Sequence, residues 1–433
     1  MVQSARLGAR SRRGIRLSLL ISVVSLALAG PATADDKATA SGLESEIEAF
    51  TGALVGGKPW LDARYRFEHV DQAGLPRDAN AHTLRARVGY RTGVYRGFSA
   101  LAEGEGILHL GDDDFNDTLN GKTAYPVVAD PESLAINQLY LQYDGFPDTR
   151  LRGGRQVFVL DNQRYIGHVG FRQNQQTFDA VTATNTSIAD TRLTYGYIFQ
   201  VLRIFGEDSP VGSFNTDSHV FNASYSGFDV ATLTAYAYLL DIEDLPARST
   251  MTFGLRAAGS YDLGKTLAEG VKALYAAEVA RQFDHANNPA DYDVGYYLVE
   301  GGLGYQGLTA KLGYEVLDGN GTQAFQTPLA TLHKFQGWAD RFLVTPAGGI
   351  RDFYASLGYK VKGLGPLDGL KLLGVYHDFS AENGGGDYGH EFDFVVSKKL
   401  FKHFTVAFKY ANYQSDGFAT DTEKIWLSLG AKF

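Results

Sequence analysis

The final stretch of the chain, Ile425-Trp426-Leu427-Ser428-Leu429-Gly430-Ala431-Lys432-Phe433, alternates apolar residues with polar or small ones. Residues two apart in a β-strand point to the same face, so one face is apolar from Ile425 to Phe433. The opposite face carries Lys424, Ser428 and Lys432. The pattern predicts a strand with one face in an apolar environment and the other in water.

The same alternation recurs along the chain, with turn residues between the segments. It is clear in Leu61–Glu68 and Leu84–Arg91, and it returns in segments that begin at Leu193, Phe253, Leu308, Phe353 and Phe404. Tyr and Phe often stand at the segment ends, as in interfacial girdles. The count is about 18 strands of roughly 10 to 14 residues. The sequence therefore predicts an all-β fold, a transmembrane antiparallel β-barrel with long extracellular or inward loops.

Composition agrees with a barrel. The chain has 50 glycines, no cysteine, 13 % aromatic residues and a mean hydropathy of -0.17. A helical membrane protein would need apolar runs of about 18 to 20 residues, and none occurs after the N-terminal region. A barrel of about 16 to 18 strands has a lumen wide enough for an aqueous channel, so size favours transport.

The N-terminal region has the features of an export signal. Five arginines lie between Arg6 and Arg16, an apolar run follows from Leu17 to Ala29, and Ala32-Thr33-Ala34 suits signal peptidase. Cleavage after Ala34 would change the formal net charge from -9 to -14, because it removes five arginines and no acid. We expect a signal peptide at 1–34, a short periplasmic segment at 35–57 and the barrel at 58–433. The terminal strand ending on Phe433 resembles the assembly signal of bacterial outer-membrane barrels.

Connections of two kinds are expected between the strands. Gly145–Asp148 and Gly363–Pro366 suit short periplasmic turns. Residues 110–133, 159–174 and 318–348 suit long extracellular or inward-folded loops. In the N-terminal segment, apolar residues at helical spacing predict one or two amphipathic turns around Leu43, Ile47, Phe50 and Leu54.

Several motifs resemble the alginate-export family of bacterial outer-membrane porins over nearly the whole chain after the signal. They are Gly57–Glu68, Tyr125–Pro131, Asn137–Leu141, Gly154–Gln156, Asp161–Arg164, Phe171–Asn174 and Thr327–Asp340. The resemblance implies an 18-stranded barrel whose arginine-lined lumen helps an anionic polysaccharide across the outer membrane.

Arginines are accordingly the candidate pore-lining and anion-binding residues. The planar, permanently charged guanidinium pairs carboxylates at two points, and a ring of such groups would select anions. Arg155, Arg164 and Arg172 match the family motifs, whereas the other candidates rest on strand periodicity or on proximity to a motif. The full set is Arg64, Arg66, Arg85, Arg87, Arg91, Arg152, Arg155, Arg164 and Arg172.

A structural role for the same arginines is the alternative. Barrel interiors often contain Arg–carboxylate pairs that satisfy the wall, and five acids are available as partners: Asp62, Glu68, Glu103, Glu105 and Asp179. If the loop 318–348 folds into the lumen, Lys334, Trp338 and Arg341 become candidates for a gate or for substrate contacts.

Other motifs do not support a different function. Gly302–Gly307 matches a dinucleotide fingerprint but lies between two alternating strands, with no helix to bind a pyrophosphate. Asp112–Asp117 resembles the start of an EF-hand, but Asp117 stands where Gly is required and Thr123 where Glu is required. None of the ten histidines lies in a recognisable catalytic setting. The sequence therefore predicts no enzyme, no cofactor and no metal site.

The sequence is interpreted as an outer-membrane porin that passes anionic saccharides or organic anions by ion transport through a charged constriction. A general porin, or an uptake porin for sugars or organic acids without an export role, is the main alternative. A barrel lipase or protease is a more distant one. Expected partners are outer-membrane lipid, a small or polymeric anionic solute and, for an exporter, periplasmic export machinery; no nucleic acid is expected.

Overall fold

The computed structural model describes residues 36–264 and 266–433, so the predicted signal peptide lies outside the described residues. Within the described residues, the part up to Gly52 and the part from Ala53 to Phe433 are two separate compact units. No helix of the described part is both long and apolar enough to cross a membrane.

The N-terminal helix α2 runs from Asp36 to Val55 and so extends well beyond the one or two turns that were expected. Leu43, Ile47, Phe50 and Leu54 recur every three or four residues along it. Their exposed fractions are 57, 55, 46 and 42 %. They form the apolar stripe that the spacing predicts.

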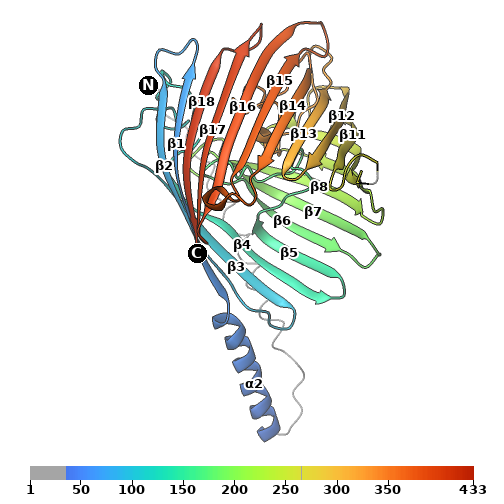
Figure 1. Ribbon diagram of the computed structural model, residues 1–433. Helices are drawn as coiled ribbons and strands as arrows, with labels where there is room; N and C mark the ends of the chain where they lie inside the picture. Colours follow the sequence, from blue (N-terminus) through green and yellow to red (C-terminus); the bar gives the residue numbers. More distant parts are fainter. Residues whose placement is uncertain (1–35, 265) are drawn as a thin grey trace, which may run out of the picture. The chain divides into compact units, whose positions relative to one another are not determined.

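Eighteen antiparallel strands form one closed barrel. The course of its wall can be followed in Figure 1. Each strand pairs with its neighbours in sequence, and β1 pairs with β18 to close the wall. The predicted strand number is confirmed. The strands are β1 Lys58–Gln72, β2 Ala79–Arg91, β3 Phe98–His109, β4 Ser133–Phe146, β5 Thr149–Gln156, β6 Thr177–Asn185, β7 Thr191–Leu202, β8 Ser213–Tyr225, β9 Ala231–Leu240, β10 Thr250–Asp262, β11 Lys272–Asp284, β12 Asp293–Tyr305, β13 Leu308–Leu317, β14 Ile350–Lys360, β15 Lys371–Ser380, β16 Asp387–Leu400, β17 Phe404–Ser415 and β18 Thr422–Lys432.

The alternation that predicted the strands separates the two faces of the wall. In β18, Leu427 and Leu429 point to the outer face and are 47 and 46 % exposed. Trp426, the residue before Leu427, points to the inner face and is only 1 % exposed. Register extends this rule to adjacent strands, because residues directly opposite one another share a face. A closed sheet leaves no unpaired edge, which is what a barrel in lipid requires.

Connections at the two ends of the barrel differ as expected. One end has short turns, such as Pro147–Asp148 between β4 and β5; the connection between β14 and β15 contains the 3-10 helix η4, Gly365–Leu367. The other end carries the three longest loops, 110–132, 157–176 and 318–349; the 3-10 helix η3 (Leu332–Lys334) lies in the last, and η2 (Pro246–Arg248) in a shorter connection. By the usual asymmetry of such barrels the short-turn end faces the periplasm.

Part of the lumen is filled by the long loops. Tyr165 and Ile166 from the loop 157–176 and Phe325 from the loop 318–349 are buried in one apolar cluster with wall residues such as Tyr236 and Tyr296. The two loops therefore fold inward, as the sequence suggested for 318–348.

Candidate functional site

The two inward loops interlock through their backbones and polar side chains. Gly167 N–H donates to Leu329 O at 2.9 Å, and Thr331 N–H donates to Gln163 O at 3.1 Å. The Gln176 amide donates to Gly167 O and Leu329 O at 2.9 and 3.0 Å. These contacts join 157–176 and 318–349 into one body, which we call the loop layer.

Two glycines permit this close contact. A Cβ at Gly167 would lie 2.3 Å from Thr331 Oγ1, and one at Gly337 would lie 2.2 Å from Glu391 Oε2 on β16. Gly337 also has a φ of +81°, which disfavours any other residue. Next to it, Ala339 N–H donates to Glu391 Oε1 at 2.7 Å. The Gly337 backbone thus holds the loop layer directly against the wall.

A buried ion network attaches the loop layer to β1 and β18. Arg172 pairs with Glu68 at 3.1 Å and with Asp340 at 3.1 Å, and Lys424 reaches Asp340 at 3.0 Å. Arg66 pairs with Asp130 from the third long loop, and Gln173 N–H donates to Asp130 Oδ1 at 2.7 Å. Arg66 and Arg172 are therefore buried and charge-compensated rather than free to bind a solute.

His333 completes this network as a neutral ring. Its Nδ1 lies 2.6 Å from Asp340 Oδ1, and its Nε2 contacts Lys409 Nζ, so Nδ1–H donates and Nε2 accepts. Burial lowers the pKa of His333 to about 3, and Lys409 adds to that effect while Asp340 opposes it. Burial opposes ionisation of Asp340, but His333 and Lys424 hold the pKa of that carboxyl well below its usual range. The network stays ionised around a neutral imidazole at pH 7.

Arg164 lies in the same layer and is only 1 % exposed. It pairs with Glu315 at 3.2 Å, donates to Gln336 Oε1 at 2.9 Å and stacks over Phe335, with 4.6 Å from Cζ to the ring centre. Arg164 therefore fixes the layer to β13 and is not a pore-lining group.

The inward arginines of β1 and β2 have mixed environments. Arg85 pairs with Asp62 at 2.6 Å, and Arg87 pairs with Glu105. Arg64 has no carboxylate partner in the described part of the chain and instead donates to Gly170 O at 3.0 Å and Gln173 Oε1 at 2.9 Å. Four of the five acids proposed as structural partners therefore form ion pairs with arginines. The fifth, Glu103, accepts a hydrogen bond from Trp60 Nε1 at 2.7 Å instead.

Arg155 does not belong among the pore-lining arginines that the sequence predicted. It lies opposite Leu139, which is 52 % exposed on the outer face, so both side chains point away from the lumen. It pairs with Asp179 at 2.9 Å and with Glu207 at 3.1 Å on that face. The prediction that Arg155 lines the pore is wrong because the strand pleat turns it outward.

Arg91 and Arg152, by contrast, face the lumen near the short turns without a carboxylate ion pair among the described residues. Arg91 donates to Tyr140 Oη at 2.9 Å. Arg152 donates to Gln142 Oε1 at 2.9 Å and lies over the Tyr140 ring at 4.3 Å. Their charges remain available to a solute.

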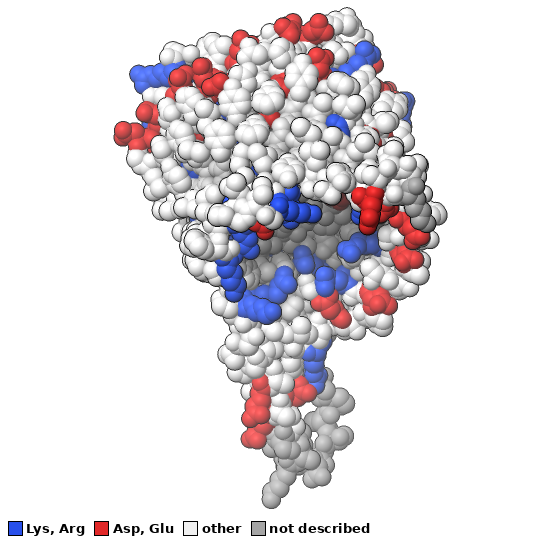
Figure 2. All heavy atoms as spheres, viewed as in Figure 1, with Lys and Arg blue, Asp and Glu red and all other residues white. Residues whose placement is uncertain are grey.

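These two arginines belong to a larger cationic rim, which we call the basic mouth. We define it as the lumen-facing charged residues in the last four positions of each strand at the short-turn end. Within the described chain it holds eleven cations against two carboxylates, Asp144 and Asp262; the cations are Lys58, Arg91, Arg150, Arg152, Arg192, Lys272, Lys311, Lys360, Lys371, Lys399 and Lys432. Figure 2 shows Lys and Arg side chains gathered around a hollow in the visible face.

The three gate candidates lie in the loop layer but differ in availability. Lys334 is exposed and donates to Asn162 O at 2.8 Å. Trp338 has its ring covered by Lys409 Nζ at 3.8 Å, which removes one stacking face from any sugar. Arg341 reaches Gln72 and Thr420 at 3.3 and 3.5 Å. Lys334 and Arg341 have no carboxylate ion pair among the described residues, and Lys334 is the more exposed of the two.

Sequence reasoning missed the lysines of the basic mouth and the buried Lys409 and Lys424. The mouth lysines were detectable, because each stands at a strand end on the wet parity of its strand. Lys409 and Lys424 were not, because their partners lie in the loop 318–349, far away in sequence. No group of His, Cys, Asp or Glu in the described residues has the geometry to hold a metal.

Comparison with known proteins identifies similar sequences and folds. A family model described as alginate export matches residues 61–315. Comparison with curated protein sequences finds no match.

Solved structures share the fold at low sequence identity. Pseudomonas aeruginosa OpdK with vanillate superposes with a TM-score of 0.69 at 15 % identity, covering 88 % of this chain and 100 % of that one. Acinetobacter baumannii OccAB4 gives 0.70 at 14 %, covering 87 and 98 %. Pseudomonas aeruginosa OccK5 (OpdH) gives 0.67 at 15 %, covering 88 and 99 %.

Proposed function

The chain belongs to the alginate-export family and is an outer-membrane channel, and we propose that it passes anionic saccharides or organic anions that enter through the basic mouth. The observation that carries this proposal is the excess of cations there, eleven against two carboxylates in the described residues. Three of these cations, Arg150, Lys311 and Lys432, pair with Asp144, Glu300 and Asp62, and the other eight have no carboxylate ion pair among the described residues. A wide aqueous mouth lined by one sign of charge concentrates the opposite ion.

The chemistry of the mouth suits carboxylates. Arg91 and Arg152 present guanidinium groups beside the Tyr140 ring. Guanidinium groups bind carboxylates at two points, and an aromatic ring nearby offers an apolar face to a sugar. A uronate residue, with one carboxylate on a pyranose ring, matches both features. Vanillate, named with the OpdK structure, likewise carries one carboxylate on a six-membered ring, although that ring is aromatic. This supports organic anions as the broader class.

The charge at the opposite end of the barrel has the other sign. The connections at the long-loop end hold nineteen Asp and Glu against eight Lys and Arg in the described chain. An anion would therefore be attracted at the periplasmic mouth and repelled by the outer rim, where capture from outside is disfavoured. The asymmetry concentrates the anion on the periplasmic side, and the gradient of the solute sets the direction of net movement, which is outward for an exporter. Periplasmic export machinery remains part of the proposal for a polymeric substrate.

The mechanism needs no covalent chemistry. An anion is drawn into the basic mouth, passes the loop layer where Lys334 is the exposed cation, and leaves through the outer rim down its gradient. Burial, with Arg256 nearby, lowers the pKa of Lys334. The fold and family are those of a channel rather than an enzyme.

Single-channel recording tests the proposal. The refolded channel is placed in a planar bilayer across a KCl gradient, and oligouronate is added to one side at a time. We expect the reversal potential to lie closer to the equilibrium potential of Cl⁻ than to that of K⁺. We also expect oligouronate to block the current more strongly when it is added on the side of the short turns. An unselective or cation-selective pore that ignores oligouronate would leave a general porin.

A further inference from the structure

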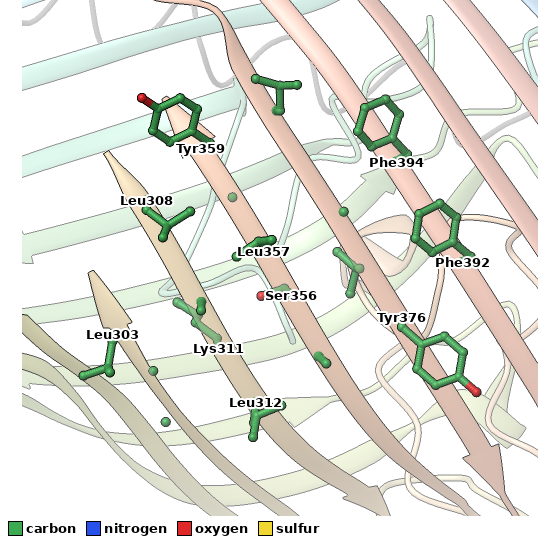
Figure 3. A pocket seen from close by; sticks show the side chains of 18 residues that line it. Leu303, Leu308, Lys311, Leu312, Ser356, Leu357, Tyr359, Tyr376, Phe392 and Phe394 are labelled. Atoms are coloured by element: carbon green, nitrogen blue, oxygen red, sulfur yellow. The ribbon is translucent and has the colours of Figure 1, made fainter. Parts of the chain in front are cut away.

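The outer face of the barrel has two neighbouring apolar grooves that the channel function does not use. The larger, of about 790 Å³, runs over β12 to β16. In Figure 3 Leu308, Leu357, Tyr359 and Phe394 project from its strands. Small residues such as Ala310, Ala355 and Gly374 form its floor. A groove this apolar on the lipid-facing wall is shaped for hydrocarbon.

The second groove lies on the other side of β16. It has a volume of about 460 Å³ and runs over β16, β17 and β18, with Val396, Phe408 and Leu427 in its walls. Lys398 and Leu370 stand at its short-turn end. The two grooves thus flank one strand and converge toward the same turns.

Cations gather where the grooves converge. Lys398 points outward from β16, since Phe392 and Phe394 on the same parity line the larger groove. Its Nζ donates to Pro366 O, so the turn between β14 and β15 bends toward the end of β16. Lys362 in that turn and Lys402 in the next are exposed and have no ion-pair partner among the described residues.

Exposed apolar residues surround these lysines. Phe401, beside Lys402, is 91 % exposed, and Leu364 and Leu367 in the neighbouring turn are 58 and 53 % exposed. Apolar side chains at the ends of these turns can enter the lipid tails, while the neighbouring lysine ammonium groups lie at the level of the headgroup phosphates.

Similar grooves on the other side of the barrel lack this charge. A groove of about 700 Å³ runs over β8 to β12, but the sequence of the connections beneath it, 226–230 and 263–271, has two acids, Asp229 and Glu269, against one lysine, Lys265. The β14–β18 side combines its apolar grooves with three lysines, Lys362, Lys398 and Lys402, against one acid in the same turns, Asp368.

We propose that the β14–β18 side binds an anionic phospholipid of the periplasmic leaflet, with its two acyl chains in the two grooves and its phosphate at Lys362, Lys398 and Lys402. Two grooves meeting at one cluster of cations match two acyl chains on one headgroup. Each lysine near a membrane surface adds about 1 kcal/mol of attraction to anionic lipid, or about fivefold in association.

Spin-labelled lipids measure this selectivity directly. The full-length channel is reconstituted in phosphatidylcholine vesicles, and the motionally restricted fraction is compared for spin-labelled phosphatidylglycerol and phosphatidylcholine. We expect phosphatidylglycerol to be preferred by about fivefold for each lysine that contacts its phosphate, and we expect the preference to fall by about that factor in each of K362Q, K398Q and K402Q and to vanish when the three are combined. Lys272→Gln, in the lumen at another turn, is the matched control and should leave the preference intact.

A second variant tests the grooves. Ala355→Phe fills the floor of the larger groove without changing charge, and we expect it to reduce retention of phosphatidylglycerol through detergent washing. Equal association of both lipids with the wild type, or a preference that the three lysine variants leave unchanged, would overturn the proposal. So would an oligomer in lipid-free detergent that Ala355→Phe dissociates, because the grooves would then hold a second copy of the chain.

Discussion

The loop layer and the basic mouth are both rich in cations, yet their surroundings give them different roles. Arg66, Arg164 and Arg172 in or against the loop layer are buried and paired with carboxylates. Arg91 and Arg152 in the mouth have neutral partners only, within the described chain. A guanidinium whose charge is already matched inside the protein builds structure, whereas an unmatched one in water attracts anions. Arginine content alone therefore does not locate a selectivity filter.

The largest expected effect is on the loop layer. Arg172→Ala removes the buried cation that Glu68 and Asp340 share and leaves them only Arg66 and Lys424, so we expect the free energy of unfolding to fall by about 3 kcal/mol. Chemical denaturation of the refolded barrel measures it. Anion selectivity should keep its sign, because the basic mouth is untouched; a loss of selectivity with unchanged stability would reverse the roles assigned to the two regions.

Acid should loosen the same layer. The unfolded chain takes up a proton on His333 below its ordinary pKa of 6.5, whereas in the folded protein the pKa is about 3. The stability that depends on a neutral ring is therefore present above pH 6.5 and is lost as the pH falls toward 3, by about 2 kcal/mol between pH 7 and pH 5.

Hydrogen exchange of residues 318–349 at pH 7 and pH 5, corrected for intrinsic rates, checks this dependence. His333→Gln keeps a polar group without a titrating ring and should flatten it. An identical pH dependence in that variant would assign the effect to another group.

A smaller effect is expected from Gly337→Ala. A Cβ there meets Glu391 in a backbone conformation that only Gly adopts easily, so we expect faster proteolysis of 318–349 and noisier single-channel current. Gly363, also at positive φ but in a short turn with nothing within 4 Å, is the matched control; Gly363→Ala should leave the current quiet.

The smallest effect is predicted for Arg155→Gln. Arg155 faces outward and pairs with Asp179 and Glu207, so its charge does not reach the lumen. The reversal potential should equal that of the wild type. A clear shift would mean that the outer face of β5 contributes to the ion path.

The sequence predicted the barrel well because alternation is a local property. The pleat that places Trp426 inside and Leu427 outside can be counted along the chain, and so can the strand number. The positions of the long loops also followed from missing alternation. The helix α2 was underestimated, since polar residues between Asp36 and Leu43 hide its beginning.

The site was predicted less well because it depends on distant partners. The motifs with Arg164, Arg172 and Thr327–Asp340 do meet, but their pairing with Glu315, Glu68 and Asp340 joins segments more than a hundred residues apart. The wrong prediction for Arg155 was avoidable. Arg155 lies three positions after Arg152 on one strand, so the two side chains cannot both face the lumen.

The reversal potential of Arg91→Gln/Arg152→Gln in a planar bilayer tests whether the basic mouth sets the anion selectivity of the channel. Both residues are half-exposed wall groups without a carboxylate partner among the described residues, so the barrel should fold normally and lose part of its charge at the mouth. We predict that the wild-type channel is anion-selective. In the double variant the reversal potential should shift toward the equilibrium potential of K⁺, whereas in Arg155→Gln it should keep the wild-type value. A double variant with an unchanged reversal potential would contradict the assignment of selectivity to the basic mouth.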